Sequence, residues 1–231
     1  MELSETEYLS IQRIIKVEAG IDLTDKKKGL VVNRLLKRLL CLNLPTFESY
    51  LCYLDANSEV EIPNLINVLT TNLTSFNREN HHFDYMFKEV LPDFRNEKVG
   101  RPLRVLSAGC STGEEALSVM MMIERFKLES PFFTYCIEGV DIDYNVVDFA
   151  KRGVYGSDSF DAPDVDMNDV RRCFNRGINS NLGFYSLKRE LTDFVSFRQG
   201  SIFGGFDLSV KYDVIFCRNV LIYFDLETQI K

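Results

Sequence analysis

Two adjacent glutamates, Glu114 and Glu115, follow a short apolar run and a turn of small residues, and they could hold a positively charged ligand. The stretch lacks both the G-x-G-x-x-G pattern and the Lys-Ser/Thr pair of a phosphate-binding loop. Carboxylates at this point would repel phosphates, but they suit S-adenosylmethionine, which carries a sulfonium and an ammonium group. The alternative is a glycine turn followed by two solvated glutamates that complement the helix dipole. This stretch alone leaves both interpretations open.

An α/β fold would place these glutamates just beyond the end of a strand. Residues 103–106 form an apolar run that predicts a short buried strand. Gly109, Ser111 and Gly113 follow, and glycine lets the backbone approach a ligand closely. Ser111 and Glu114 have the spacing of a capping box, which predicts that a helix begins there. A strand, a glycine turn and a helix in this order are typical of α/β folds that hold an adenosine-containing cofactor.

A further acid follows the next predicted strand, residues 132–140. Asp141 lies at the carboxyl end of that strand, where an acid can accept hydrogen bonds from ribose hydroxyls. The alternative role, capping the next helix, fits Asp143 better. We therefore expect Glu115 to bind the cationic methionine end of the cofactor and Asp141 to bind its ribose.

Composition limits the class of protein. The chain has 231 residues, 45% of them hydrophobic, which is enough for one large domain or for a large and a small one. A net charge of −7 argues against general nucleic-acid binding. The chain has neither an apolar run of ~18 residues nor a signal-peptide pattern, so we expect no membrane span. The six cysteines are scattered and the two histidines are adjacent, which predicts reduced thiols, a cytoplasmic protein and no metal site.

The first 70 residues predict helices only. Ser4 and Glu7 form a capping box, and Gly20 marks the end of the helix that they start. A second helix, residues 25–42, has a basic face that could dock on an acidic partner. A solvated helix face explains this pattern equally well. The basic residues are Lys26, Lys27, Lys28, Arg34, Lys37 and Arg38.

The remaining chain combines further predicted helices and strands. One short helix follows Pro45 and another begins near Pro63, and a polar linker covers residues 70–79. A helix that begins at residue 79 should end before Pro92. The other predicted helices span residues 144–151 and 163–173, and the other predicted strands span residues 174–177, 183–187, 195–198 and 212–217, with a last helix beginning before the chain ends.

Four stretches resemble one family, the chemotaxis receptor methyltransferases, which are CheR-type protein-glutamate O-methyltransferases. The stretches are TTNLTSFNRE (70–79), SAGCSTGEE (107–115), GVDID (139–143) and IFCRNVLIYFD (215–225). The resemblance covers essentially the full chain in order and spacing. It implies an all-helical N-terminal domain, residues 1–72, and a Rossmann-like class I S-adenosylmethionine methyltransferase domain, residues 73–231. A small β insert is expected at about residues 174–190.

The same resemblance implies a reaction. The methyl donor would be S-adenosylmethionine, the product S-adenosylhomocysteine, and the acceptors glutamate side chains of chemotaxis receptors during adaptation. Arg78 would orient a carboxylate, and the Tyr223 hydroxyl would steer the acceptor oxygen. Ser201 and Ile202 stand where the family usually has Asn-Leu. The cofactor contacts carried over to this sequence are Asn72, Thr74, Arg78, Glu115, Asp141, Ser201, Ile202, Arg218 and Asn219.

Departures from the family lie beside the implied site, where Asn77 replaces an aromatic residue and Ala116-Leu117 replaces Pro-Tyr. The implied partner is the cytoplasmic domain of chemotaxis receptors, reached through the basic helix 26–42 and the β insert by a monomeric protein. Fewer core strands are predicted than the family sheet has, so we expect the natural chain to continue past Lys231. Two alternatives stay open: methylation of another protein or a small molecule, and a cofactor-binding regulatory protein with little turnover.

Overall fold

The computed structural model describes residues 2–96, 100–203 and 210–230, which group into two compact units. The helical unit contains residues 2–71 and 218–230 together with Phe203. The sheet unit contains residues 72–96, 100–202 and 210–217. Among the residues described, no helix has both the length and the apolar character needed to cross a membrane.

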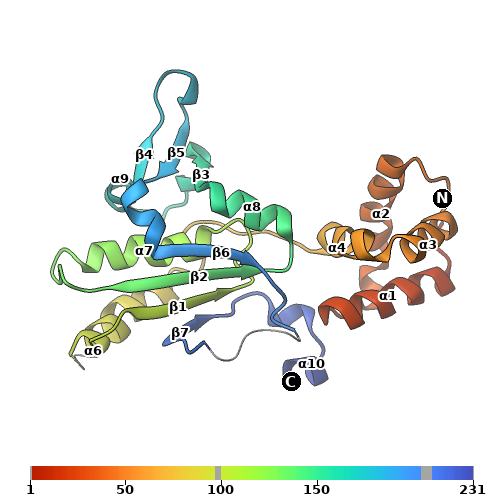
Figure 1. Ribbon diagram of the computed structural model, residues 1–231, viewed down its shortest axis with the longest axis horizontal. Coiled ribbons are helices and arrows are strands. Elements are labelled where there is room, and N and C mark those ends of the chain that lie inside the picture. Colours follow the sequence, from red (N-terminus) through yellow and green to blue (C-terminus); the bar gives the residue numbers. More distant parts are fainter. Residues whose placement is uncertain (1, 97–99, 204–209, 231) are drawn as a thin grey trace. The chain divides into compact units, whose positions relative to one another are not determined.

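The helical unit is built from α-helices and short 3₁₀ turns (Figure 1). Its first helix begins at the capping box of Ser4 and Glu7 and ends at Gly20, whose φ is 71°, so both predictions are confirmed. A 3₁₀ turn, Asp25–Lys27, precedes the second helix. The helices are α1 (Glu5–Ala19), α2 (Lys28–Leu42), α3 (Phe47–Ala56), α4 (Ser58–Leu69) and α10 (Leu226–Ile230), and a 3₁₀ turn, Leu221–Tyr223, lies before α10.

Two predictions that rested on proline are wrong. Helix α4 begins at Ser58 and therefore contains Pro63, and among its residues before the proline Glu61 is buried. The second helical run comprises α5 (His81–Tyr85), a π-helical turn (Met86–Val90) and α6 (Leu91–Asn96), and it continues past Pro92. Pro92 comes directly after the π-helical turn, in which the Leu91 N–H donates to the Met86 carbonyl five residues back.

The main sheet of the sheet unit is parallel, with strand order β6-β2-β1-β7 (Figure 1). Its strands are β1 (Leu103–Ala108), β2 (Tyr135–Asp141), β6 (Val195–Gln199) and β7 (Val214–Phe216). The predicted start of β2 at residue 132 is wrong, since Phe132 is 97% exposed. Ala108 pairs with Val140, so the carboxyl ends of β1 and β2 lie side by side. An N-terminal all-α part and a parallel α/β part were both predicted.

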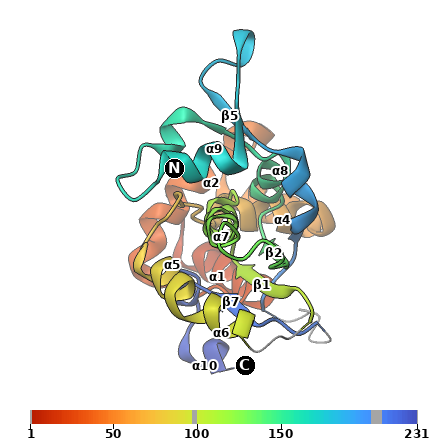
Figure 2. The same cartoon turned by 90° about the vertical axis from the view of Figure 1, so that its left-hand side faces the viewer.

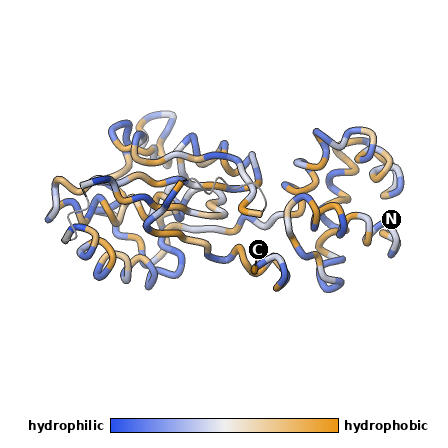
Figure 3. The backbone as a smooth tube through the Cα atoms, turned by 60° about the horizontal axis from the view of Figure 1, so that its bottom comes forward, coloured by the Kyte–Doolittle hydropathy of each residue, from blue (hydrophilic) through white to orange (hydrophobic). Residues whose placement is uncertain are grey.

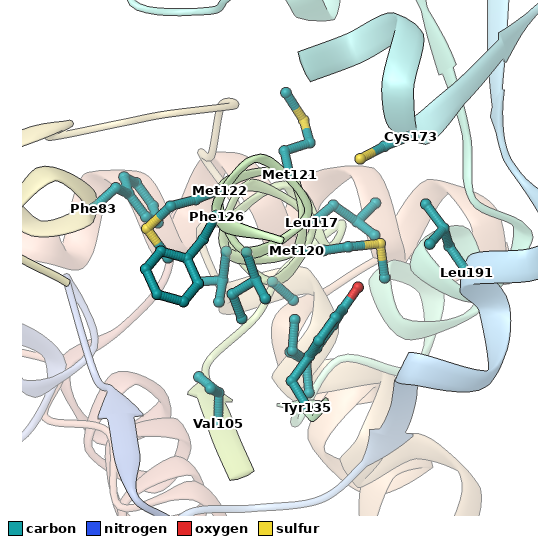
Figure 4. Packing of buried hydrophobic residues seen from close by; sticks show 14 of the residues in the cluster. Phe83, Val105, Leu117, Met120, Met121, Met122, Phe126, Tyr135, Cys173 and Leu191 are labelled. Atoms are coloured by element: carbon teal, nitrogen blue, oxygen red, sulfur yellow. The ribbon is translucent and has the colours of Figure 1, made fainter. Parts of the chain in front are cut away.

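Helix α7 (Glu114–Phe126) packs on this sheet and is buried on nearly all sides (Figure 2). Three consecutive methionines point in different directions from it (Figure 4). Met120 lies near Tyr135 of β2, Met121 lies on the side of the helix that faces Cys173, and Met122 points toward Phe83. Because α7 is packed on nearly all sides, its first turn is a rigid support for the residues beyond β1.

A small antiparallel sheet forms the insert, with strand order β3-β5-β4. Its strands are β3 (Val154–Gly156), β4 (Phe174–Arg176) and β5 (Phe184–Leu187), and the β4–β5 hairpin projects away from the main sheet (Figure 1). The hairpin was predicted, but β3 was not. Helix α8 (Tyr144–Arg152) precedes β3, and helix α9 (Met167–Cys173) lies between β3 and β4. Apolar and polar residues alternate along the helices of both units, as expected where one face is buried (Figure 3).

Candidate cofactor-binding site

The turn between β1 and α7 is shaped by backbone conformations that favour glycine. Gly109, Ser111 and Gly113 have φ angles of 75°, 49° and 97°. A Cβ at Gly113 would lie 2.9 Å from the Ala150 Cβ and 2.9 Å from the Tyr155 hydroxyl, so the turn has no room for a side chain there. The predicted Ser111–Glu114 capping box is wrong, because Gly113 is the N-cap residue and makes no side-chain cap bond.

Asp141 joins this turn to the end of β2. Its Oδ2 accepts a hydrogen bond from the Ser111 backbone N–H at 2.8 Å, and its Oδ1 accepts one from the Asp143 N–H at 3.0 Å. The residue is only 8% exposed, and burial raises the pKa of its carboxyl above the usual value. A carboxylate has about four acceptor positions, so Asp141 can accept a ligand hydroxyl in addition to these backbone groups.

Glu114 and Glu115 are also buried, at 8% and 9% exposure, so the interpretation as solvated glutamates is wrong. The Ser107 hydroxyl of β1 donates to Glu115 Oε1 at 2.7 Å. The Thr112 hydroxyl donates to Glu114 Oε2 at 2.6 Å, while burial raises the pKa of Glu114. Ser107 was missed by the sequence analysis, although a polar residue in an apolar strand just before the turn is a usable signal.

Asn72, in the linker, contacts both the glycine turn after β1 and Asp143. Its carbonyl accepts the Ser111 hydroxyl at 2.9 Å, and its side-chain amide donates to Asp143 Oδ2 at 2.7 Å. Asp143 also accepts the Asn145 N–H at 2.9 Å and thereby caps α8, as predicted. The structure therefore gathers Asn72, Asp141 and the acids of α7 around one turn.

The rest of the linker is folded locally. Thr74 is half-buried. The Arg78 guanidinium donates to the Leu73 carbonyl at 2.8 Å, and this bond closes the segment that precedes α5. Asn77, with a φ of 53°, donates from its side chain to the Asp164 carbonyl at 2.6 Å. The amide at this departure from the family thus connects the linker to the loop before α9.

The remaining predicted site residues lie on later segments. Ser201 and Ile202 follow β6, and Ile202 packs against Leu106, Ala108 and Val140 at the ends of β1 and β2. Arg218, Asn219 and Tyr223 belong to the helical unit. Their roles, like those of the other site residues, stay predictions.

The arrangement at the ends of β1 and β2 fits S-adenosylmethionine. Among the described residues, no lysine or arginine pairs with Glu114 or Asp141, so these desolvated carboxylates suit a ligand that brings positive charge and hydroxyl donors. The close-packed glycine turn lets the backbone reach an adenosine moiety. The acids would repel the phosphates of a nucleotide. That Glu115 and Asp141 hold the cofactor stays a prediction.

Comparisons with known proteins agree with this chemistry. Residues 72–231 match the family described as CheR methyltransferase, SAM binding domain, and residues 6–70 match its all-alpha domain. The chemotaxis protein methyltransferase of Escherichia coli K12 is 36% identical over 231 residues, covering 99% of this chain and 78% of that protein. Chemotaxis protein methyltransferase 2 of Pseudomonas aeruginosa is 38% identical over 215 residues, covering 91% of this chain and 73% of that protein. The chain belongs to the CheR methyltransferase family, with S-adenosylmethionine as its methyl donor.

Proposed function

We propose that this protein transfers the methyl group of S-adenosylmethionine to glutamate side chains of chemotaxis receptors, in the cytoplasm, as part of chemotactic adaptation. The observation that carries the proposal is the group of buried carboxylates at the carboxyl ends of β1 and β2. It supports binding of a sulfonium cofactor, and the relatives named above are chemotaxis protein methyltransferases.

When bound, S-adenosylmethionine would supply its sulfonium methyl to a glutamate oxygen; the electron pair of the broken S–CH3 bond would stay on sulfur, and the products would be a glutamate methyl ester and S-adenosylhomocysteine. A free glutamate has a pKa near 4.3, so the acceptor is already ionised and the protein needs no general base. The protein must instead align the acceptor oxygen and exclude water, because the approaching charges neutralise each other.

Each predicted site residue has a role in this scheme. Glu115 binds the cationic methionine end, and Asp141 binds the ribose hydroxyls. Arg78 orients a carboxylate through paired hydrogen bonds, and the Tyr223 hydroxyl steers the acceptor oxygen. The remaining cofactor contacts are Asn72, Thr74, Ser201, Ile202, Arg218 and Asn219.

The receptor would reach the protein through two surfaces. Lys37 is exposed on α2 and can attract an acidic receptor helix. Strand β4 forms an edge of the small sheet, where a receptor tail could add a strand. Asn179 has a φ of 52° and Gly183 a φ of 89°, so the asparagine adopts the left-handed conformation in the long loop between β4 and β5, where the family commonly has glycine.

The test is methyl incorporation from labelled S-adenosylmethionine into cytoplasmic fragments of chemotaxis receptors. Base-labile label on glutamate is the expected result. The same fragments with the modified glutamates changed to alanine serve as the control. Cofactor binding without label on any receptor fragment would contradict the proposal, and it would favour another acceptor or a regulatory role.

A further inference from the structure

The segment that contains Tyr223 is attached to the N-terminal part of the helical unit. The Asp22 backbone N–H donates to the Tyr223 carbonyl at 2.7 Å, and Ile21 forms an antiparallel bridge with Phe224. The Lys16 ammonium lies 2.7 Å from Asp225 Oδ1. This ammonium holds the pKa of Asp225 below its usual value. These contacts fix the backbone on both sides of the tyrosine.

The ring of Tyr223 has a partner of its own. The Lys27 Nζ lies 5.5 Å from the ring centroid, within the range of a cation–π interaction. The same Nζ donates to the Asp22 carbonyl at 3.1 Å. Lys27 and Asp22 therefore hold the ring and the backbone of Tyr223 together.

The loop that carries Lys27 is itself anchored to α1. The Tyr8 hydroxyl, fully buried in the helical core, donates to the Thr24 carbonyl at 2.8 Å. The Gln12 amide donates to the Leu23 carbonyl. An ordered path thus runs from the core of the helical unit through Lys27 to the tyrosine ring.

We propose that Lys27 is a positioning residue that sets the orientation of the Tyr223 ring for methyl transfer. The inference rests on the proposed function, in which the Tyr223 hydroxyl steers the acceptor oxygen. A small error in that alignment lowers the rate of the chemical step without changing cofactor affinity. Lys27 then acts inside the protein, whereas its place on a basic surface had suggested receptor docking.

The experiment measures kcat, the receptor KM and S-adenosylhomocysteine affinity for Lys27→Met, Lys27→Arg, Tyr223→Phe and the Lys27→Met/Tyr223→Phe double variant. Lys27→Met should lower kcat roughly 2- to 30-fold with little change in KM or cofactor affinity. Lys27→Arg keeps a cation over the ring and should restore most of the rate. The double variant should be no slower than Tyr223→Phe, because Lys27 acts only through the tyrosine.

Arg13→Met is the matched control, since Arg13 is exposed on α1 and makes no hydrogen bond or ion pair with the residues described. Lys27→Gln repeats the test with a polar side chain if Lys27→Met unfolds. A raised receptor KM at unchanged kcat, or additive losses in the double variant, would overturn the inference. If Tyr223→Phe itself keeps the wild-type rate, the proposed role of Tyr223 fails instead, and the inference fails with it.

Discussion

Glu61 in the helical unit and Asp141 in the sheet unit are both buried carboxylates, at 1% and 8% exposure, but their surroundings differ. The Arg38 guanidinium binds both oxygens of Glu61, at 2.9 and 2.5 Å, and the Tyr50 hydroxyl donates to it at 2.9 Å. The hydrogen bonds that the described residues make to Asp141 come from backbone N–H groups. Among the residues that the structure describes, Glu61 has an internal cation, whereas the donors to Asp141 are neutral.

The presence or absence of an internal cation distinguishes a buried carboxylate that stabilises the fold from one that can bind a ligand. A buried ion pair with its hydrogen bonds satisfied holds helices together, and it has little left to offer a ligand. Burial without a countercharge raises the pKa of Asp141 and of Glu114, which is a common sign of a functional site. A positively charged ligand would offset the free-energy cost of keeping these buried carboxylates ionised.

The largest expected effect comes from breaking the internal pair. Arg38→Met leaves Glu61 charged, buried and without its cation, so it should lower the free energy of unfolding by about 3–5 kcal/mol. Chemical denaturation of the full chain measures the loss. Lys37→Met, one residue away and exposed, is the matched control.

A triple variant tests whether the unpaired charge of Glu61 causes this loss of stability. Replacing Arg38 and Glu61 together by leucine, with Tyr50→Phe, removes the whole polar group and should recover most of the lost stability. If the single and triple variants were equally unstable, packing and not charge would explain the loss.

The next effect concerns the acids at the ends of β1 and β2. Glu115→Gln keeps an acceptor for the Ser107 hydroxyl but removes the charge, so S-adenosylhomocysteine binding should weaken by about 1.5–3 kcal/mol with little change in stability. Asp141→Ala should weaken binding by a similar amount. Calorimetry measures both, and Glu129→Gln, exposed just beyond the other end of α7, is the control. Unchanged affinity in both variants would contradict the assignment.

A smaller effect should appear as a pH dependence. Because burial raises the pKa values of Asp141 and Glu114 above the ordinary 3.8 and 4.5, part of the ligand-free protein is protonated just above these values. A bound cation favours the ionised carboxylates and lowers their pKa, so binding releases protons in this window. Cofactor affinity should therefore fall as the pH falls, by at most about tenfold per pH unit for each group.

Calorimetry in two buffers with different ionisation enthalpies counts these protons. Proton uptake on binding, or none at all, would show that the acids at the ends of β1 and β2 do not respond to the ligand.

Local patterns predicted much of this fold from the sequence. The Ser4–Glu7 capping box, the Gly20 stop and the strand before the glycine turn depend on residues that are close in the chain. Most of the order of strands and helices could also be predicted, because the spacing of apolar residues differs between strands and helices. The position of Asp141 at the carboxyl end of β2 could be predicted from the same local pattern.

Long-range partners could not be predicted in the same way. Arg38 was assigned to a docking face, but it pairs with Glu61, 23 residues away. Arg34 donates to the Leu69 and Thr70 carbonyls at the end of α4, and Lys28 pairs with Glu5. The Ser111 hydroxyl, expected to cap α7, instead binds Asn72 in the linker. In each case the partner is brought near only by folding, so the sequence spacing carries no signal.

These pairings leave a narrower basic face than the sequence indicated, and they place the smallest predicted effect at Lys37. Lys37 is exposed on α2, and Lys37→Glu should slow methylation of a receptor fragment a few-fold at low salt by opposing an acidic surface. Above about 0.5 M salt the Debye length is only a few ångströms, so the difference from wild type should disappear. Initial rates at two salt concentrations measure this, and cofactor affinity should not change. Arg13→Glu makes the same charge reversal on α1, and an equal response from it would mean that net charge, and not a docking face on α2, controls the rate.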